Sequence, residues 1–475
     1  MATFSIENFG CRATDADAAS LRGEMMAKGL SLTSDHAAAD VVVLNTCTVT
    51  AAADSQARDA VRKIHRANPA ARIVVTGCYA QRAPEELASL AGVAWVVGNS
   101  HQMEIPGLVE NPVAQLESRC ESNDFFLLTD IADAPLSLAK GPAKILTGDI
   151  FARTTLPIAA SNHLPHGTSG AEDRTRPILK IQDGCNNRCS YCVIPFVRGR
   201  SRSMLPDDVV GQVRQLVRAG AREVVLSGIN LGSYGRDLVP KVQLATTVRR
   251  ILRETSIEQL RFSSIEPQDL TEEFISLVAS SPRIAPHFHV PLQSGSDRIL
   301  RAMHRWYRAA HYAERIHLIR RLLPHAAIGA DVIVGFPGET EDDFRATLEF
   351  IERLPFAYLH VFSFSERSGT KAAGLAGAVP PQIISERARA LRALSQTKAA
   401  GFRAAMAGCG MRALTLSRGG DGWTEALTGN YLKVRISGCH RANEWREVHV
   451  TADPLEILKP ESLADPDVLA TTASW

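Results

Sequence analysis

The chain has 475 residues, enough for roughly three domains, and its 45% apolar and 22% charged content excludes a disordered, collagen-like or coiled-coil protein. The formal net charge is only +2, from 53 basic and 51 acidic side chains, which argues against polyanion binding by charge alone. The 9 cysteines are too few, and odd in number, for a disulfide scaffold, so their positions decide what they do.

The first 117 residues predict a parallel α/β domain, because short apolar runs alternate with polar helical stretches. The predicted strands are Phe4–Phe9, Asp40–Asn45, Arg72–Thr76 and Val93–Gly98, and the predicted helices are Asp15–Lys28, Ala51–Ala67 and Pro84–Leu90. A parallel crossover needs a dozen or more residues, which the longer helices supply. Residues 118–175 lack periodicity, so we expect a linker or insertion there, with a short strand near Phe125–Leu128.

Residues 176–401 repeat a strand-then-helix unit. The predicted strands are Ile178–Gln182, Glu223–Ser227, Gln259–Ser263, His287–Pro291, Ile328–Val334 and Tyr358–Phe364. The helices between them are Asp207–Arg218, Thr246–Glu254, Glu272–Ala279, His311–Leu323 and Glu341–Leu354. Six units predict a partial (βα)6 barrel, since a closed barrel of this kind has eight, and a doubly wound sheet is the alternative. Residues 118–401 carry an excess of basic over acidic side chains, so the near-neutral total conceals a basic middle.

Residues 402–464 predict a small β-barrel, because short β-rich runs are separated by Gly-rich turns. The predicted strands are Arg412–Leu416, Tyr431–Ile436, Glu447–Val450 and Leu455–Leu458. The expected fold class is therefore α/β, with a parallel N-terminal domain, a partial barrel and a small C-terminal β-barrel.

The strongest chemical signal is a loop with three cysteines, Cys185, Cys189 and Cys192, directly after the first barrel strand. Thiolates select iron–sulfur clusters, zinc or copper(I). Three cysteines leave one iron of a four-iron cluster without a protein ligand and open to a substrate. Zinc sites usually add a second pair of ligands at fixed spacing, and the sequence has no such pair.

A second set of cysteines is dispersed along the N-terminal domain. Cys11, Cys47 and Cys78 each directly follow a predicted strand. Strand ends of a parallel sheet share one edge, where ligand sites form, so these three thiols predict a second cluster with a second open iron. The alternative is three small buried hydrophobic residues, since free cysteines are often buried. Cys120, Cys409 and Cys439 belong to no motif, and we expect them to be structural or incidental.

The CxxxCxxC loop resembles the signature of the radical S-adenosylmethionine (SAM) superfamily, in which the open iron binds SAM and its reductive cleavage gives a deoxyadenosyl radical. Longer segments resemble the methylthiotransferases of that superfamily: Asn45–Thr50, Thr76–Gln81, Cys192–Ser203, Leu226–Asn230, Pro291–Ser296 and Gly335–Thr340. After Cys11 the run Arg12–Asp15 departs from the family pattern, so we expect different polar contacts there.

The resemblance implies an N-terminal cluster domain, a radical SAM barrel and a C-terminal RNA-binding module called TRAM. It implies two [4Fe–4S] clusters as metal and catalytic centres, one on Cys185, Cys189 and Cys192 and one on Cys11, Cys47 and Cys78. SAM would be both radical source and methyl donor, and the second cluster would deliver sulfur. A radical suits the target, because carbon two of adenine carries an unactivated C–H bond.

Within the family, Ser263–Pro267 and Cys47–Thr50 look most like the MtaB branch. That branch is implied to place a methylthio group on carbon two of threonylcarbamoyladenosine beside the tRNA anticodon. Sister branches act on isopentenyladenosine in tRNA or on an aspartate of a ribosomal protein. Two other classes are a non-catalytic iron–sulfur RNA-binding protein and a cobalamin-dependent radical SAM methylase, whose Asp-x-His-x-x-Gly loop is absent from the sequence.

Candidate binding residues follow from position in the predicted barrel. SAM is expected over the barrel mouth, and its candidate contacts are Tyr191, Gly228, Asn230, Glu266, Gln293 and Gly335. RNA phosphates could contact Arg198, Arg200 and Arg202, and the C-terminal module offers Trp423, Tyr431 and Lys433 for stacking and charge. The basic stretch 301–321 is either a phosphate-binding surface or a solvated helix face.

The expected partners are a tRNA anticodon stem-loop, a flavodoxin- or ferredoxin-like electron donor and a sulfur donor. We expect a monomer. We also expect a cytoplasmic location and no membrane contact, because the N-terminus lacks a signal peptide and no apolar run approaches 18 residues.

Overall fold

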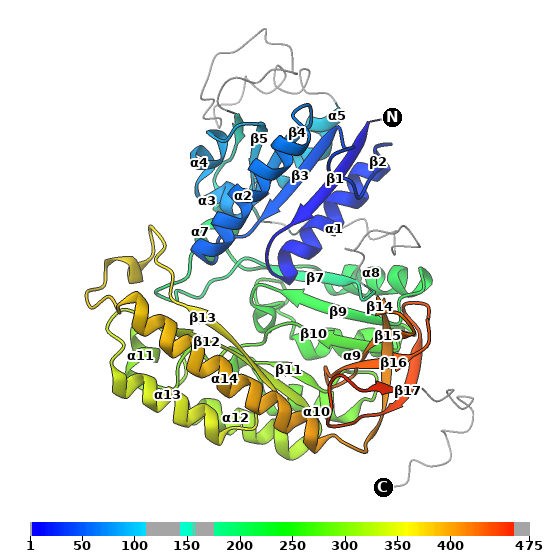
Figure 1. The fold of residues 1–475 in the computed structure, drawn as a ribbon, viewed down its shortest axis with the longest axis vertical. Coiled ribbons are helices and arrows are strands. Elements are labelled where there is room, and N and C mark those ends of the chain that lie inside the picture. Colours follow the sequence, from blue (N-terminus) through cyan, green and yellow to red (C-terminus); the bar gives the residue numbers. More distant parts are fainter. Residues whose placement is uncertain (1, 111–142, 155, 157–174, 460–475) are drawn as a thin grey trace.

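The structure is a computed structural model that describes residues 2–110, 143–154, 156 and 175–459. An α/β domain lies at one end, a partial barrel lies below it, and a C-terminal β module lies beside the barrel (Figure 1). Within these residues, no helix is long and apolar enough to cross a membrane. The predicted strand near Phe125–Leu128 and Cys120 lie outside the described residues.

The N-terminal domain is a six-stranded parallel sheet in the order β2-β1-β3-β4-β5-β6. Its strands are β1 (Thr3–Asn8), β2 (Ser31–Leu32), β3 (Val41–Thr46), β4 (Arg72–Gly77), β5 (Val93–Gly98) and β6 (Lys144–Leu146). Its helices are α1 (Arg12–Ala27), α2 (Ala51–Ala67), α3 (Cys78–Arg82), α4 (Pro84–Ala88) and α5 (Ile105–Glu110), with a short 3-10 helix η1 (Gln102–Glu104). Every residue of β3 is buried, and its side chains alternate between two cores, with Val42 in one and Val43 in the other. Helices therefore cover both faces, as a parallel sheet requires.

The N-terminal sheet extends beyond the boundary that the sequence suggested. Strand β6 pairs with β5, with Lys144 opposite Trp95, and it lies inside the segment predicted to be a linker. Three residues carry too little periodicity to be recognised as a strand. The segment predicted to be a linker or insertion therefore contributes an edge strand to the sheet.

Six parallel strands form the barrel, as the repeat predicted. They are β7 (Ile178–Asp183), β9 (Glu223–Gly228), β10 (Gln259–Phe262), β11 (His287–His289), β12 (Ala327–Val334) and β13 (Tyr358–Ser363), and a short strand β8 (Arg202–Ser203) pairs antiparallel with β7. The helices are α7 (Ile194–Arg198), α8 (Pro206–Arg218), α9 (Leu244–Glu254), α10 (Glu272–Ser280), α11 (Asp297–Ala302), α12 (Ala309–Leu322), α13 (Glu341–Arg353) and α14 (Pro381–Ala405). The 3-10 helices are η2 (Ile150–Ala152), η3 (Leu231–Ser233), η4 (Pro267–Asp269) and η5 (Lys371–Gly374).

The barrel wall has two segments, β10-β9-β7-β8 and β11-β12-β13. They meet where the backbone amide of Leu260 donates to Arg283 O and the amide of Ala285 donates to Leu260 O, both at 2.8 Å. In the described part of the chain β8 and β13 do not pair with each other, so the barrel stays open on that side.

The C-terminal module is a curled five-stranded sheet in the order β17-β14-β15-β16-β18. Its strands are β14 (Gly410–Gly420), β15 (Trp423–Thr428), β16 (Lys433–Ser437), β17 (Trp445–His449) and β18 (Ile457–Leu458). Strand β15 was not predicted, since only its Trp and Thr residues favour a strand. Within residues 402–459, β17 and β18 form free edges, so the small β-barrel predicted there has the form of a curled half-barrel.

The module shares a hydrophobic core with the barrel. Phe402 and Ala327 pack in one cluster with Val434 of β16. The fully buried Arg261 guanidinium donates to Gly429 O at 2.9 Å. The barrel and the module are therefore one packed unit.

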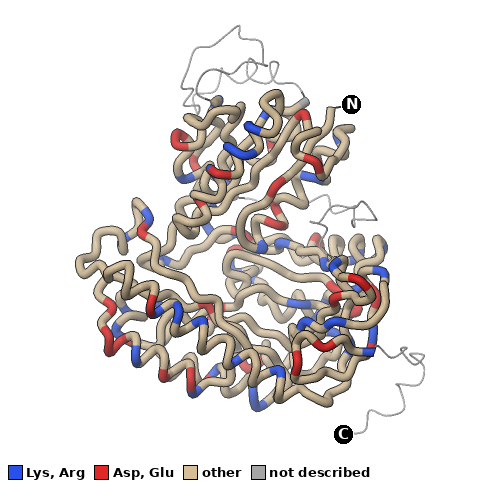
Figure 2. The backbone as a smooth tube through the Cα atoms, viewed as in Figure 1, with Lys and Arg blue, Asp and Glu red and all other residues tan. Residues whose placement is uncertain are grey.

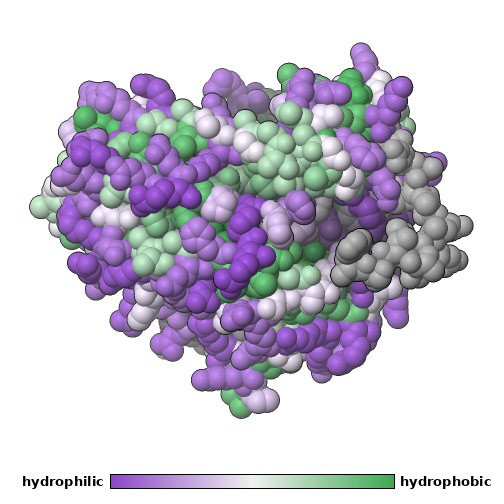
Figure 3. Space-filling model, turned by 90° about the horizontal axis from the view of Figure 1, so that it is seen from below, coloured by the Kyte–Doolittle hydropathy of each residue, from purple (hydrophilic) through white to green (hydrophobic). Residues whose placement is uncertain are grey.

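Charged residues of both signs are interspersed over the whole molecule (Figure 2). Seen from below, hydrophilic side chains cover much of the surface, with hydrophobic residues in patches between them (Figure 3). In the view of Figure 2, the basic residues of the middle section are interspersed with acidic ones along the backbone.

A matched pair of glycine substitutions tests the barrel packing. A Cβ at Gly329 in β12 would lie 2.0 Å from Tyr358 Cζ, whereas a Cβ at Gly401 in α14 would meet nothing within 4 Å. We expect Gly329→Ala to destabilise the fold by about 1–3 kcal/mol through overpacking. Gly401→Ala should stabilise it by about 1 kcal/mol through helix propensity. Chemical denaturation measures both, and effects of the same sign would contradict the packing of Tyr358 over β12.

Candidate active site

The first candidate ligand set lies in the loop that follows β7. Gly184 turns the chain with φ +70°, and a Cβ there would lie 2.0 Å from Arg200 O. The backbone amide of Cys185 donates to Gly199 O at 3.1 Å. This tight turn holds three cysteines at the carboxyl end of the first barrel strand: Cys185, Cys189 and Cys192.

Hydrogen-bond donors surround two of these sulfur atoms. Arg305 Nη1 donates to Cys189 Sγ at 3.2 Å, and the amide of Asn187 donates to Cys185 Sγ at 3.4 Å. Burial raises the pKa of the Cys185 thiol to about 11 and also raises the pKa of Cys192. Both thiols are therefore protonated at neutral pH unless a metal displaces the proton.

The second ligand set lies at successive strand ends of the N-terminal sheet. Cys11 directly precedes α1, Cys47 follows β3, and Cys78 begins α3 after β4. Burial raises the pKa of the Cys47 thiol to about 12, and the neighbouring Cys11 and Cys78 thiols raise it too. A Cβ at Gly10 would lie 2.7 Å from Cys47 Cβ, so the absence of a side chain there lets the Cys11 segment approach Cys47. The three thiols therefore lie together.

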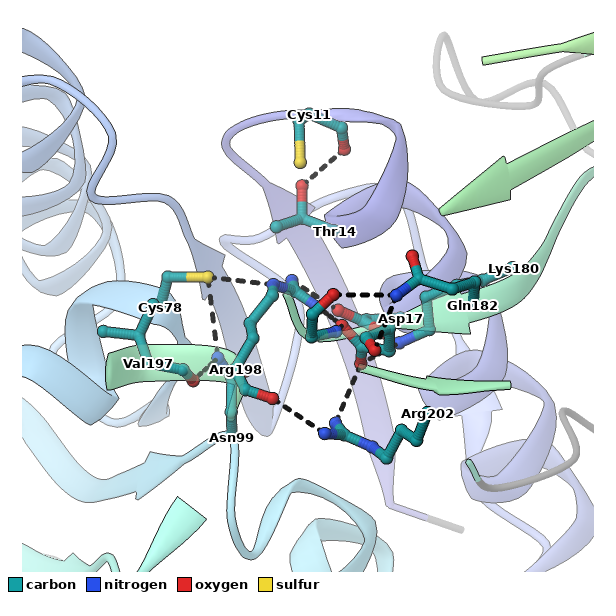
Figure 4. Close-up of polar contacts among 12 residues, drawn as sticks. Cys11, Thr14, Asp17, Cys78, Asn99, Lys180, Gln182, Val197, Arg198 and Arg202 are labelled. Atoms are coloured by element: carbon teal, nitrogen blue, oxygen red, sulfur yellow. Dashed lines mark hydrogen bonds and ion pairs between the residues drawn. The ribbon is translucent and has the colours of Figure 1, made fainter. Parts of the chain in front are cut away.

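Arg198 of α7 joins the barrel to the second ligand set, and Figure 4 shows its side chain reaching Cys78. It follows the barrel cysteine loop in the chain, and its side chain is only 2% exposed. Its Nε donates to Cys78 Sγ at 3.2 Å, and its other nitrogens pair with Asp17 at 2.8 Å and Asp183 at 3.1 Å. A barrel guanidinium is thus fixed against a sulfur atom of the N-terminal domain.

Other charges complete this buried network. Asp183 also pairs with Lys180 at 2.9 Å and with Arg202 at 3.2 Å. Although burial opposes ionisation, Lys180 and Arg198 hold the pKa of Asp183 well below its usual range. Asn99 Nδ2 is a second donor to Cys78 Sγ, at 3.5 Å.

A cavity of about 190 Å³ lies where the barrel cysteine loop meets the segment that follows Cys47. Tyr191 and Cys192 of the barrel loop line it, as do Val49 and Thr50, which directly follow Cys47. The remaining lining residues come from the barrel: Val193, Ile194, Gln293, Asp331, Ile333, Phe362, Ser363, Phe364 and Ser365. A group held in this mostly apolar cavity would touch Cys192 of the barrel set and the segment that follows Cys47.

The predicted SAM contacts are dispersed around the barrel mouth. Tyr191 and Gln293 line the cavity, and Gln293 Oε1 is buried without a hydrogen-bond partner in the described chain. Gly228 ends β9, and the amide of nearby Asn230 donates to Gln182 Oε1 at 2.8 Å.

Two further SAM candidates already have partners within the protein. Glu266 pairs through one carboxylate oxygen with the buried Arg305. The amide of Gly335 donates to Glu339 Oε2 at 2.7 Å. Only a backbone approach to Gly335 remains for a ligand.

Two of the predicted RNA contacts in the barrel are wrong. Arg198 and Arg202 are buried and paired with carboxylates, so they cannot reach a phosphate. The prediction assumed that the alternating arginines Arg198, Arg200 and Arg202 share one exposed surface. Of these three side chains, only Arg200 is exposed. Arg305, from the basic stretch 301–321, is likewise buried and lies against Cys189.

The C-terminal candidates divide in a similar way. Tyr431 stacks on His287 of the barrel at 4.3 Å between ring centroids, so its ring is not free to stack on a base. Its hydroxyl accepts a hydrogen bond from Arg12, directly after Cys11, at 3.4 Å. Trp423 is half-buried with Arg435 over its ring at 4.6 Å, and the exposed Lys433 pairs with Glu425 at 3.2 Å.

Sequence reasoning missed the donors to sulfur. Asn99 directly follows β5, so the rule that found Cys47 and Cys78 at strand ends could have found it as well. No sequence pattern marks Arg305 as a donor to sulfur, because only the fold brings this residue next to the cysteine loop. Asp17 lies on a helix and shows no motif.

The donor chemistry fits two iron–sulfur clusters. Each set offers three thiols, which leaves one iron of a four-iron cluster open. Among the described residues, the one group of His, Cys, Asp or Glu arranged closely enough for a single ion contains no cysteine. Neither thiol set is therefore arranged as a site for one zinc ion, which needs ligands at close tetrahedral spacing.

Two family models match the chain. Residues 3–98 match the model described as Uncharacterized protein family UPF0004, and residues 179–351 match the radical SAM superfamily. The first match covers the domain that holds Cys11, Cys47 and Cys78, and the second covers the barrel cysteine loop.

Curated relatives are similar over most of their length. Threonylcarbamoyladenosine tRNA methylthiotransferase MtaB of Aquifex aeolicus is 37% identical over 434 residues, which cover 91% of this chain and 96% of that protein. The tRNA-2-methylthio-N(6)-dimethylallyladenosine synthase of Thermobifida fusca is 32% identical over 470 residues, covering 98% and 86%.

A solved structure shares the fold. The radical S-adenosylmethionine methyltransferase TsrM from Kitasatospora setae superposes with a TM-score of 0.57 at 16% identity, covering 82% of this chain and 85% of that one. At this identity the likeness concerns the fold alone, and it agrees with the α/β domain and partial barrel described above.

Substitution of Arg198 tests the buried network. Arg198→Met leaves Asp17 and Asp183 with fewer counterions, so we expect it to destabilise the protein by about 3 kcal/mol. Arg200→Met is the matched control, because this neighbouring arginine is exposed, and its effect should stay within about 0.5 kcal/mol. The free energy of unfolding of each variant is measured with a denaturant. Equal values for the two variants would contradict the network.

Alkylation of the cluster-free protein tests the burial of Cys185. Because its pKa is raised to about 11, the reactive thiolate fraction should grow about tenfold per pH unit between pH 8 and 10. The rate of carbamidomethylation by iodoacetamide is measured by mass spectrometry of the Cys185 peptide. The exposed Cys439 serves as the reference for reagent decay. A Cys185 rate that levels off below pH 9.5 would contradict the raised pKa.

Proposed function

Because the chain belongs to the radical SAM methylthiotransferase family, we propose that it adds a methylthio group to carbon two of threonylcarbamoyladenosine beside the anticodon of tRNA. The family uses two [4Fe–4S] clusters and S-adenosylmethionine. Relatives named for this substrate include the Aquifex protein and MtaB of Bacillus subtilis, which is 36% identical over 395 residues.

The observation that carries the proposal is the cavity that Cys192 of the barrel set lines together with Val49 and Thr50, the residues that follow Cys47 of the second set by two and three positions. Transfer of sulfur to a carbon atom requires that the centre that activates the carbon and the centre that holds the sulfur both reach that carbon atom. Cys192 and Thr50 contribute to one cavity wall from two different domains. Two clusters with unrelated functions would not need a cavity that residues near both of them line.

The protein's own residues have separate tasks around that cavity. When bound, the barrel cluster and SAM supply a carbon radical, and the N-terminal cluster holds the sulfur to be transferred. Apolar side chains such as Ile333 and Phe364 exclude water from the cavity. Arg305 and Arg198 each donate to a cysteine sulfur, so they offset the negative charge that thiolate ligands bring into a buried site.

The second candidate substrate is isopentenyladenosine in tRNA. It is favoured by relatives named tRNA-2-methylthio-N(6)-dimethylallyladenosine synthase, one of them 36% identical over 466 residues. Both candidates share the adenine and differ only in the group on its N6 atom. An enzyme that distinguishes the two substrates must therefore contact the group on N6, and not only the adenine.

Further parts of the proposal concern partners and location. We propose that tRNA contacts involve Arg200, Trp423 and Lys433, which are at least partly exposed. An electron donor of the flavodoxin or ferredoxin kind and a sulfur donor would serve the two clusters. We propose a monomer that works in the cytoplasm, where tRNA is modified.

Nucleoside analysis tests the proposed function. The chain is expressed in a strain that lacks its own enzyme, and digested tRNA is analysed by mass spectrometry. Wild-type protein should add a methylthio group to threonylcarbamoyladenosine. Cys47→Ser should abolish the product, and the control Cys439→Ser, on the exposed C-terminal module, should leave it unchanged.

Other outcomes of this experiment discriminate between the alternatives. Methylthio product on isopentenyladenosine instead would assign the sister substrate. Deoxyadenosine after anaerobic reduction with SAM separates an enzyme from a non-catalytic RNA-binding protein. Wild-type product levels from Cys47→Ser protein with an intact barrel cluster would overturn the role of the N-terminal thiols.

A further inference from the structure

A second group of possible metal ligands lies inside the barrel, on strands that carry none of the cysteines. His289 ends β11, Asp331 lies in β12 and His360 lies in β13. Asp331 and His360 are register partners on adjacent parallel strands, and His289 is the register partner of Gly329, two residues before Asp331. Side chains two residues apart share a face, so all three project from the same side of the sheet.

The potential ligand atoms converge. His289 Nε2 lies 2.9 Å from Asp331 Oδ1, and His360 Nδ1 lies 3.3 Å from the same oxygen. One atom from each of the three side chains lies within 4.8 Å of the other two. This spacing suits a single ion, and neither thiol set is grouped in this way among the described residues.

A hydrogen bond behind the group orients His289. Its Nδ1 lies 3.1 Å from Tyr358 Oη, so its Nε2 faces Asp331. Tyr358 Oη also lies 2.9 Å from His287 Nε2, and the ring fits there because Gly329 has no side chain. Metal-binding histidines characteristically engage their other ring nitrogen in such a bond, which fixes the tautomer and the ring orientation.

The group is accessible from two directions. Asp331 lines the cavity where the barrel cysteine loop meets the segment that follows Cys47. The His360 side chain is 54% exposed and offers an entry path for an ion from solvent. An ion held here would keep a coordination position toward the cavity, open to an oxygen donor of the molecule that occupies it.

We propose that His289, Asp331 and His360 bind one divalent transition-metal ion of the zinc class. Two imidazoles and one carboxylate with an open position suit Zn²⁺, Fe²⁺ or Co²⁺, whereas Mg²⁺ and Ca²⁺ prefer oxygen ligands throughout. This ion is distinct from the clusters, because its ligands are nitrogen and oxygen atoms. The site does not depend on which nucleoside the enzyme modifies.

Zinc binding by the cluster-loaded protein tests the site. With both thiol sets occupied by iron, protein is equilibrated with Zn²⁺, desalted and analysed for zinc and iron. We expect about one zinc per chain in the wild type and none in the double variant His289→Ala/His360→Ala. Tyr358→Phe, which leaves the three ligands in place but removes the orienting bond to His289 together with the bond to His287, should weaken the affinity about 10- to 100-fold. Isothermal titration with Zn²⁺ measures this change.

The matched control is His317→Ala, which removes an exposed histidine on the outer helix α12 and should keep the full zinc content. Iron content and thermal unfolding report whether each variant is folded. A second probe is Co²⁺, whose high-spin electron paramagnetic resonance signal is visible beside oxidised, diamagnetic clusters. We expect it in the wild type and in His317→Ala, and not in the double variant.

Two results would overturn the proposal. Wild-type protein without zinc after desalting would show that the group is a histidine–carboxylate ion pair only. Equal zinc contents in the wild type and in a folded double variant would place the ion elsewhere.

Discussion

The arrangement of this molecule depends on one buried guanidinium. Arg198 belongs to the barrel, yet it is held by Asp17 of the N-terminal domain and by Asp183 of the barrel, and it donates to the sulfur of Cys78. A charge this deeply buried is tolerable only when all of its partners are in place. The docking of the two domains and the environment of one thiol set are therefore the same interaction, and neither can change alone.

Local patterns were sufficient to predict the six barrel strands and the two cysteine sets, but not the longest described helix, α14. Helix α2 matches its predicted bounds, Ala51–Ala67, because apolar residues recur with helical period between a capping Thr50 and Asn68. Cys47 and Cys78 could be assigned to one sheet edge because parallel topology brings strand ends together. Strand β6 and strand β15 were missed, since three residues show no period and Trp423–Thr428 contains few β-branched residues.

The exposure of charged side chains was the property that could be predicted least well from the sequence. Arg198, Arg202 and Arg305 resemble a basic surface when read along the chain, and all three are buried against carboxylates in the fold. Whether an arginine meets a phosphate or an aspartate depends on segments that are distant in sequence, such as Asp17 on α1. The same limit hid the group on β11, β12 and β13, whose members become neighbours only through strand register.

The hydrogen bond from Arg12 to the hydroxyl of Tyr431 joins the residue after Cys11 to the C-terminal module, and the Tyr431 ring stacks on His287 of the barrel. All three parts of the chain thus meet at one side chain. The C-terminal module is consequently not an interchangeable attachment. A homologous module grafted onto this barrel would have to bring a matching aromatic residue at position 431, so residues 12, 287 and 431 are expected to vary together rather than one at a time.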